Sequence, residues 1–403
     1  MEQERRDLSL YVHIPFCKAK CIYCDFLSFG GCGYHEQKQY TEALCKEIEA
    51  YRPFAGDYCI RTIFFGGGTP SYVDSGLLKQ IMHTIQNVFY IGPDAEITME
   101  GNPDSLTWDK VSAYRRLGMN RLSIGLQSTN DEVLKRLGRV HNYDQFIAAY
   151  SNARQAGFAN INVDLMSGLP GEPETSYIRT LAKVVELQPE HISAYSLIVE
   201  EGTPLGKNDL LLNQLPSEEE DRRLYTKTKM LLKNSGYERY EISNYARKGY
   251  QCRHNIVYWT LQEYLGVGLG ASSCLDVHTT GEEMQTIRFH GIADLNEYID
   301  FFTALDGGNT DSLKQLIRSG YREQQITGRK DQMEEFMFLG LRMAEGISKK
   351  DFFARFGVDI ENVYGKIIAK YIEEQLLLET GDRLYLSDAG IDVSNVVMAE
   401  FIL

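Results

Sequence analysis

Apolar and polar positions alternate regularly between residues 8 and 197. Short apolar runs lead into longer segments whose apolar residues recur at helical spacing. The runs predict strands at Leu8–Ile14, Thr62–Phe65, Ala95–Met99, Arg121–Gly125, Asn160–Leu165 and His191–Leu197. The longer segments predict helices at Tyr34–Ala50, Leu77–Val88, Ser105–Leu117, Asp131–Leu137, Asp144–Ala156 and Thr175–Leu187. Such alternation forms parallel βαβ units, and six strands fall short of the usual eight-unit barrel. The pattern therefore predicts an α/β fold, a partial (β/α)6 barrel.

The pattern changes after the sixth predicted strand. The segment Leu205–Arg223 is polar and acidic and includes Ser217–Asp221, which predicts a solvated connecting face. Met230–Glu241 resumes helix and strand, and after about Gly307 the pattern becomes helical with stripes of Phe, Leu and Ile.

The C-terminal part resembles a winged-helix module. Gly346–Asp351, Val363–Leu377 and Arg383–Ser387 predict two helices followed by a small hairpin. Because Glu373–Asp388 is not notably basic, we expect this α-rich part to pack or to dock a partner rather than to bind DNA. The predicted domains are a barrel at 1–205, a region at 206–306 that completes it, and a C-terminal domain at 307–403.

Composition narrows the class of protein. The 403 residues are 43% hydrophobic and 24% charged, as in a soluble globular protein, and no apolar run approaches a membrane span. The net charge of −14 argues against a general nucleic-acid binder. The charged start Met1–Asp7 is no signal peptide, and 8 cysteines are too few for a disulfide framework. These features predict a cytoplasmic protein.

Three cysteines near the start carry the strongest chemical signal. Cys17, Cys21 and Cys24 are separated by three and then two residues. Three such thiolates can hold a [4Fe–4S] cluster and leave its fourth iron open for another ligand. The alternatives are a zinc site, for which a second pair of ligands is missing, and a redox pair formed by Cys21 and Cys24. The other cysteines predict idle thiols, although Cys32 lies close to this loop.

Polar and glycine motifs follow the other predicted strands. Gly66–Pro70 follows the second strand, Glu100 the third and Gln127 the fourth, while Asp164 and Gly168–Gly171 end the fifth. Barrel enzymes carry their active sites at the C-terminal ends of the strands. The glycines let a ligand approach the backbone, with amides free to meet a carboxylate. Taken singly, each motif is also consistent with a turn or a surface residue.

These motifs resemble the radical-SAM superfamily, and more narrowly its oxygen-independent coproporphyrinogen III oxidase group. The likeness covers about Ser9 to Ser273 and includes Gly138-Arg139. It implies a three-quarter barrel, a [4Fe–4S] cluster and S-adenosylmethionine. The cluster ligands would be Cys17, Cys21 and Cys24. Contacts to a first S-adenosylmethionine would come from Tyr11, Gly67 and Glu100. A second position, whose retention here is open, would be lined by Tyr23, Gly68, Thr69, Gln127, Arg139 and Asp164.

Two departures from the oxidase resemble instead the heme-chaperone (HemW) branch. Phe26 stands where the oxidase has a fourth cysteine, and the chain begins about ten residues before Tyr11. The segment His254–Trp259, His-Asn-Ile-Val-Tyr-Trp, looks like that branch's signature. His254 would ligate heme iron and Tyr258 and Trp259 would contact the porphyrin. A buried structural histidine is the alternative.

The resemblance predicts a heme chaperone that binds heme and passes it to an unidentified acceptor protein. The alternative is an oxygen-independent coproporphyrinogen III oxidase, and another radical-SAM enzyme acting on tetrapyrroles is a third option. Whether S-adenosylmethionine is cleaved, and so whether the protein is an enzyme, stays open. The predicted cofactors are a [4Fe–4S] cluster, S-adenosylmethionine and heme. A peripheral membrane contact and a homodimer are open options, and no nucleic-acid partner is expected.

Overall fold

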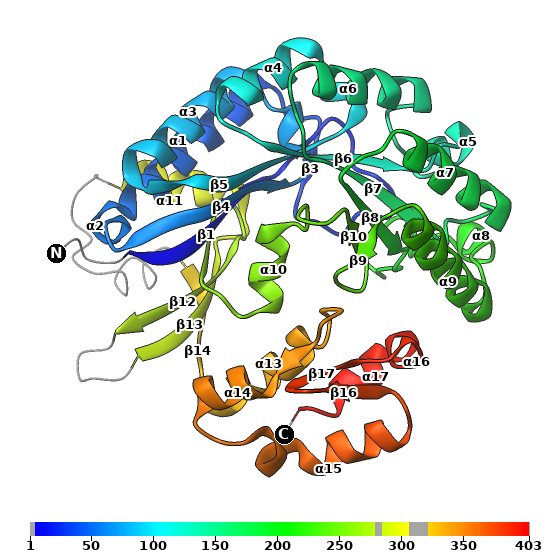
Figure 1. Cartoon of the computed structure of the whole chain (residues 1–403). Helices are drawn as coiled ribbons and strands as arrows, with labels where there is room; N and C mark the ends of the chain where they lie inside the picture. The colour runs from blue at the N-terminus through cyan, green and yellow to red at the C-terminus, as the bar shows by residue number, and fades with distance from the viewer. Residues whose placement is uncertain (1–4, 279–283, 306–320, 403) are drawn as a thin grey trace.

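A partial barrel forms the larger part of the molecule. The computed structural model describes residues 5–278, 284–305 and 321–402 (Figure 1). Parallel strands lie side by side in chain order, which confirms the predicted partial (β/α)6 barrel. They are β1 (Arg6–Ile14), β4 (Tyr58–Gly67), β5 (Tyr90–Gly101), β6 (Arg121–Gln127), β7 (Ile161–Ser167) and β8 (His191–Ser196).

Helices cover the outer face of this barrel (Figure 1). They are α1 (Tyr34–Ala50), α2 (Arg52–Ala55), α3 (Ser75–Val88), α4 (Trp108–Arg116), α5 (Asp131–Arg136), α6 (Tyr143–Gln155), α7 (Glu174–Glu186), α8 (Asp209–Leu212), α9 (Glu218–Asn234) and α11 (Leu295–Ala304). The side chains of β1 show how the two faces differ. Leu10 and Val12 are fully buried in the main hydrophobic core, while the alternate residues Tyr11 and His13 belong to the other face. Because strand side chains alternate, every second residue reaches the barrel interior.

Further strands extend both edges of the barrel sheet to twelve strands. One edge adds β11 (Tyr264–Val267), which is parallel to β1, and then the antiparallel β12 (Ser272–His278), β13 (Met284–Gly291) and β14 (Tyr321–Thr327). The other edge adds β10 (Asn244–Ala246) and β9 (Glu238–Arg239). The short helix α10 (Arg253–Trp259) stands between the barrel and the C-terminal part (Figure 1).

The acidic segment was predicted as a solvated connecting face, and from Glu218 onward its exposed carboxylates lie on a helix that was not predicted. Helix α9 begins there, and Ser217 forms a capping box with Glu220. Acidic residues in a first helical turn favour the helix because they face its unpaired N–H groups. The run Ser217–Asp221 is therefore a helix start whose carboxylates happen to be solvated.

The C-terminal part has a hydrophobic core of its own, which includes Phe352, Tyr364 and Leu384. Its elements are α13 (Arg329–Gly340), β15 (Ile347–Ser348), α14 (Lys349–Phe356), α15 (Ile360–Glu373), β16 (Leu377–Thr380), β17 (Arg383–Leu386), α16 (Asp388–Asp392) and α17 (Ser394–Ala399). The strands pair as β15-β17-β16, so the helices precede a small hairpin as predicted. The predicted boundary at 306/307 touches residues 306–320, outside those described, and the division into domains stays a prediction.

Membrane-spanning helices are absent from the described ranges. None of the helices assigned there has both the length and the apolar composition that a bilayer crossing requires.

Candidate functional site

The cysteine loop is anchored by its backbone at several points. It lies between β1 and α1, and short strands β2 (Phe16–Cys17) and β3 (Phe29–Gly30) pair across its base. The Ile22 N–H donates to the Leu137 carbonyl at 3.1 Å, and the Leu205 N–H donates to the Ile22 carbonyl at 2.9 Å. The loop is thus held by segments that are far apart in the sequence.

The three predicted ligand thiols lie near one another. Cys17 is buried, and Cys21 and Cys24 are half-buried. Burial raises the pKa of the Cys17 and Cys24 thiols, and the neighbouring cysteines add to the shift. In the described ranges, no three His, Cys, Asp or Glu side chains converge as one metal ion requires. Cysteine thiolates are the usual ligands of iron–sulfur clusters.

A chain of hydrogen bonds joins two of these cysteines through the barrel. Thr69 Oγ1 donates to Cys17 Sγ at 3.4 Å and accepts from Asn102 Nδ2 at 3.3 Å. Asn102 Oδ1 accepts from Arg139 Nη2 at 2.8 Å, and Arg139 Nη1 reaches Cys21 Sγ at 3.6 Å. The predicted residues Thr69 and Arg139 therefore contact two of the cysteines predicted to hold the cluster. Asn102, which sequence reasoning missed, links them, and its place directly after Glu100 and Gly101 was the available signal.

Arg139 brings a buried positive charge to the cysteine loop. Burial by itself would lower the pKa of this guanidinium, but Tyr23 and Cys21 beside it raise the pKa. The same charge acts against burial by lowering the pKa of the Cys17 thiol, and so favours its thiolate, the form that binds iron. Tyr23 is itself largely enclosed, packing with Leu137 and Met166, and it stands beside Arg139 and Cys21.

The glycine loop is shaped by close packing, and its amides are already used. A Cβ on Gly67, whose φ is +109°, would lie 2.6 Å from the His13 ring, and one on Gly68 would lie 2.9 Å from Phe16 backbone atoms. The N–H groups of Gly68 and Thr69 donate to the Ile14 and Phe16 carbonyls, both at 2.8 Å. The expectation that free amides here would meet a ligand carboxylate is therefore wrong for these two groups.

Gln127 adopts a backbone conformation that is rare outside glycine. Its φ is 71°, and the pairing of β6 with β7 shifts register between Gly125 and Gln127. A Cβ on Gly125 would lie 3.1 Å from both Gln127 Nε2 and Arg139 Nη2. Because Gly125 has no side chain, these two polar groups fit side by side. The strained backbone at Gln127 is typical of functional positions.

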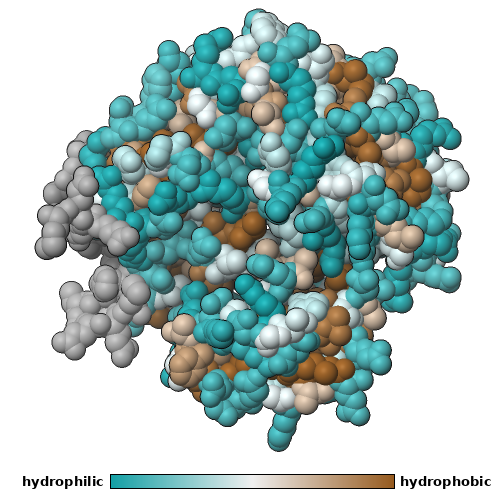
Figure 2. All heavy atoms as spheres, in the orientation of Figure 1, coloured by the Kyte–Doolittle hydropathy of each residue, from teal (hydrophilic) through white to brown (hydrophobic). Residues whose placement is uncertain are grey.

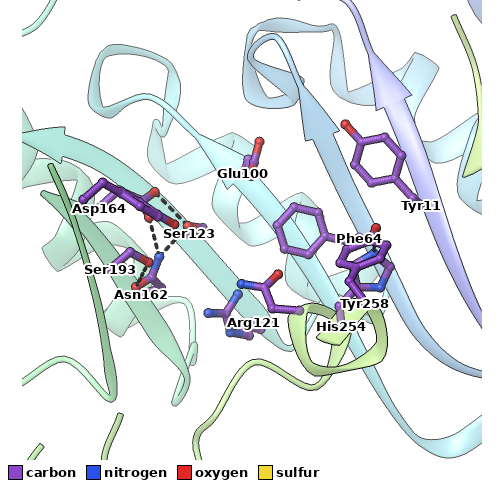
Figure 3. A pocket seen from close by; sticks show the side chains of 12 residues that line it. Tyr11, Phe64, Glu100, Arg121, Ser123, Asn162, Asp164, Ser193, His254 and Tyr258 are labelled. Atoms are coloured by element: carbon purple, nitrogen blue, oxygen red, sulfur yellow. Dashed lines mark hydrogen bonds between the residues drawn. The ribbon is translucent and has the colours of Figure 1, made fainter. Parts of the chain in front are cut away.

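The barrel interior encloses a polar cavity of about 170 Å³ (Figure 3). Its walls bring together five of the predicted residues, Tyr11, Glu100, Asp164, His254 and Tyr258. Asp164 accepts hydrogen bonds from Ser123 Oγ at 2.9 Å and from Asn162 Nδ2 at 2.7 Å, as the dashed lines in Figure 3 mark. Polar side chains at alternate strand positions therefore line the barrel interior as well as the ends of the strands.

Burial raises the pKa of two carboxyl groups in this cavity. Burial raises the pKa of Glu100 to about 8, with the nearby Asp164 adding to the shift and the Gly67 backbone opposing it. Burial also raises the pKa of Asp164, while hydrogen bonds from Ser123 and Asn162 hold it down. At neutral pH Glu100 is therefore largely protonated and can donate a hydrogen bond.

Arg121 is a second polar residue that sequence reasoning missed. It is 2% exposed, lines the cavity from the start of β6, and its Nε has no hydrogen-bond partner in the described ranges. Burial by itself would lower the pKa of this guanidinium, but Cys252, Glu96, Tyr240 and Asp164 nearby raise it. The sequence signal was a charged residue beginning a strand that is otherwise buried throughout.

His254 is held inside the barrel by both ring nitrogens. Nδ1 is 2.6 Å from Thr62 Oγ1 and Nε2 is 2.9 Å from Tyr258 Oη, and the ring stacks on Phe64 with centroids 5.1 Å apart. Burial lowers the pKa of His254 to about 3, so the ring is neutral. The geometry matches the structural alternative for this histidine, and neither nitrogen is free for iron in this conformation.

Trp259, the third predicted heme residue, belongs to a different site. Its ring packs under the Arg342 guanidinium, 4.4 Å from the ring centroid, and lines a cleft against the C-terminal part. Positions 254 and 258 are one helical turn apart and share a face of α10, while 259 falls on another face. The structure therefore brings His254 and Tyr258 together and separates them from Trp259.

Comparisons with known proteins identify the family to which this chain belongs. Residues 11–184 match the Radical SAM superfamily, and residues 328–393 match the HemN C-terminal domain. The chain is 32% identical over 396 residues to the heme chaperone HemW of Lactococcus lactis, which covers 98% of this chain and 97% of the relative. It is also 32% identical over 405 residues to the heme chaperone HemW of Bacillus subtilis, with 98% and 99% covered. The chain belongs to the HemW family.

The superfamily match confirms the predicted [4Fe–4S] cluster and S-adenosylmethionine as cofactors. A solved structure of coproporphyrinogen III oxidase (HemN) from Escherichia coli, a radical SAM enzyme, superposes with a TM-score of 0.82. It covers 99% of this chain and 90% of that chain at 24% sequence identity, which shows the shared fold.

Proposed function

We propose that this protein is a heme chaperone that binds heme and transfers it to an acceptor protein. The observation that carries the proposal is the similarity to HemW heme chaperones along nearly the whole chain, including the barrel and the C-terminal part. The protein would carry its cluster on Cys17, Cys21 and Cys24. The fourth iron would stay open to S-adenosylmethionine, which supplies the radical chemistry of the superfamily.

Different residues of the barrel would contact the two positions of S-adenosylmethionine. We propose that Tyr11, Gly67 and Glu100 contact the first molecule. Tyr11 and Glu100 line the same cavity, and protonated Glu100 can donate to a ligand oxygen. A second position would be lined by Tyr23, Gly68, Thr69, Gln127, Arg139 and Asp164. Thr69 and Arg139 already contact cysteine sulfur, which favours a role in setting the cluster environment.

The alternative function is that of an oxygen-independent coproporphyrinogen III oxidase. The shared fold permits it, because the TM-score to the HemN oxidase is high. Against it stands Phe26, whose side chain is 69% exposed on the cysteine loop where the oxidase group has a further cysteine. An acceptor protein, a homodimer and a peripheral membrane contact are the partner proposals that accompany the chaperone function.

The two functions separate in one anaerobic experiment. Protein with a reconstituted cluster is titrated with hemin and followed by its Soret absorbance, and the loaded protein is then mixed with apomyoglobin as a test acceptor. In parallel, coproporphyrinogen III turnover is assayed with S-adenosylmethionine and a reductant. We expect stable heme binding, heme transfer and no decarboxylation. Repeated turnover without heme retention would assign the oxidase function instead.

A further inference from the structure

A second and larger cavity opens between α10 and the C-terminal part. It has a volume of about 540 Å³ and is lined by Trp259, Phe336, Met343, Arg355 and Arg383, among others. Figure 1 shows α10 facing α13, and Figure 2 shows hydrophobic residues between the barrel and the lower lobe on a mostly hydrophilic face. Ligand pockets usually enclose roughly 300–1,000 Å³. This cleft falls within that range, whereas the barrel cavity beside His254, at about 170 Å³, does not.

We propose that this cleft, defined by Trp259, Phe336, Met343, Arg355 and Arg383, is where the protein holds heme. The porphyrin would lie against the aromatic side chains, with its propionates toward the two arginines. The inference rests on the proposed heme-chaperone function and assigns a place to its cargo. It moves the heme away from His254, the residue that the sequence resemblance had favoured.

The inner part of the cleft offers flat and sulfur-bearing side chains. Trp259 and Phe336 come from the facing helices α10 and α13, and the buried Trp259 Nε1–H has no hydrogen-bond partner among the residues that the structure describes. Met343 is only 7% exposed. Of the side chains lining the cleft, all of them within the described ranges, Met343 is the one whose type commonly ligates heme iron. An aromatic platform with one soft donor suits a tetrapyrrole that must later be released.

The outer part of the cleft offers cations that are only weakly engaged. Arg383 Nη1 is 3.9 Å from Glu345, and Arg355 Nη1 donates to the Leu261 carbonyl at 3.3 Å. Glu345 and Asp351 also line the rim. Recognition of propionates therefore has to come from directed guanidinium hydrogen bonds rather than from an overall positive field.

The cleft walls are held in place by backbone contacts. Met343 forms an isolated β-bridge with Glu241 of the barrel part, and the Ala344 N–H donates to the Tyr240 carbonyl at 2.9 Å. Leu261, at the rim, has a φ of 53°. A Cβ on Gly346 would lie 2.0 Å from the Leu384 carbonyl oxygen, so this position admits only glycine. Such fixed walls are typical of a preformed binding site.

The test compares two doubly substituted proteins with the same change in charge. Arg355→Glu with Arg383→Glu reverses the cleft cations. Arg116→Glu with Arg179→Glu reverses exposed arginines on α4 and α7, far from the cleft in Figure 1. Each protein is titrated with hemin under anaerobic conditions, and thermal unfolding shows that it is folded. We expect hemin to bind about tenfold more weakly to the cleft variant, which is the loss of about 1.4 kcal/mol, and unchanged to the control.

A second readout uses the two tryptophans, Trp108 on α4 and Trp259 in the cleft. In Trp108→Phe, hemin should quench the remaining emission more completely than it does in Trp259→Phe, because quenching grows with proximity. Equal hemin affinity of the cleft and control variants, or equal quenching of the two tryptophans, overturns the cleft assignment and leaves the chaperone proposal standing. Failure of the unsubstituted protein to bind hemin overturns the chaperone proposal itself.

Discussion

The two ends of the barrel differ in how their polar residues are organised. At the cysteine end, Thr69, Asn102 and Arg139 connect Cys17 to Cys21 through hydrogen bonds. At the α10 end, His254 is closed off by Thr62 and Tyr258, and the larger opening lies on the other side of the helix. At the cysteine end, the residues around the motif form one connected site. At the α10 end, the residues of the motif lie in two different environments.

This difference shows that residues of one sequence motif do not always form one site. The cysteine motif lies on a loop, where residues close in sequence can surround one cluster. The segment His254–Trp259 lies on a helix, where neighbouring residues point in different directions. Glu96 fixes this helix by accepting from the N–H groups of Arg253 and His254 at 3.3 and 3.2 Å, so its faces are set by the barrel.

The largest effect is expected at the cysteine end. Cys21→Ser should abolish cluster assembly, because a hydroxyl cannot replace the thiolate ligand, and iron and acid-labile sulfide should fall to background. Cys32→Ser is the matched control, since Cys32 is a half-buried cysteine near the same loop. A full iron content in Cys21→Ser, or its loss in Cys32→Ser, would show that the ligand set is wrong.

The next effect is expected from Arg139→Met, which breaks the chain of hydrogen bonds while keeping apolar volume. Asn102 Oδ1 and the Gly125 carbonyl would lose their donor. We expect the free energy of unfolding to fall by about 3 kcal/mol, because each acceptor left without a donor costs about 1–3 kcal/mol. Urea unfolding measures this loss, with Arg179→Met as an exposed control. The cluster should also become harder to reduce, since a nearby positive charge is gone, and an unchanged reduction potential would contradict the proposed contact.

His254→Ala tests the α10 end. It leaves a cavity and takes a partner from both Thr62 and Tyr258, so we expect a loss of about 2–3 kcal/mol in the free energy of unfolding. The exposed hydrogen bond between His290 and Ser272 provides the control, and His290→Ala should cost far less. Hemin affinity of the folded His254→Ala protein should be unchanged. Loss of hemin binding without loss of stability would return the heme site to the barrel interior.

The smallest effect is a pH dependence from Glu100. Burial raises its pKa from 4.5 to about 8, so its contribution to stability is complete below about pH 4.5 and is lost as the pH rises through about 8. Glu100→Gln lacks this dependence. Between pH 7 and pH 8 the variant should therefore gain about 1 kcal/mol relative to wild type. Unfolding at several pH values measures the gap.

The sequence predicted the barrel well because its strands are apolar runs buried on both faces. The strands of residues 8–197 needed only boundary changes, such as the start of β4 at Tyr58 rather than Thr62. Of the extra strands, β9 falls within the helix and strand predicted at Met230–Glu241. Strands β10–β14 were not predicted, because some are very short and the others pair at a sheet edge. The acidic start of α9 was not predicted as a helix, because charge was considered without its cap at Ser217.

The site was predictable where residue type alone carried the chemistry. Cysteine spacing indicated the cluster, and the strand-end motifs indicated the barrel interior. Asn102 and Arg121 were missed because their roles arise from contacts between strands that only the fold creates. The separation of Trp259 from His254 could have been predicted from helical geometry, had His254–Trp259 been recognised as a helix.

The most direct test of the central proposal is Mössbauer and EPR spectroscopy of anaerobically reconstituted protein, with and without S-adenosylmethionine. Three cysteine ligands around an open iron predict a four-iron cubane whose reduced EPR signal changes when S-adenosylmethionine is added. Protein that assembles no four-iron cluster, or a cluster whose signal is indifferent to S-adenosylmethionine, would contradict it.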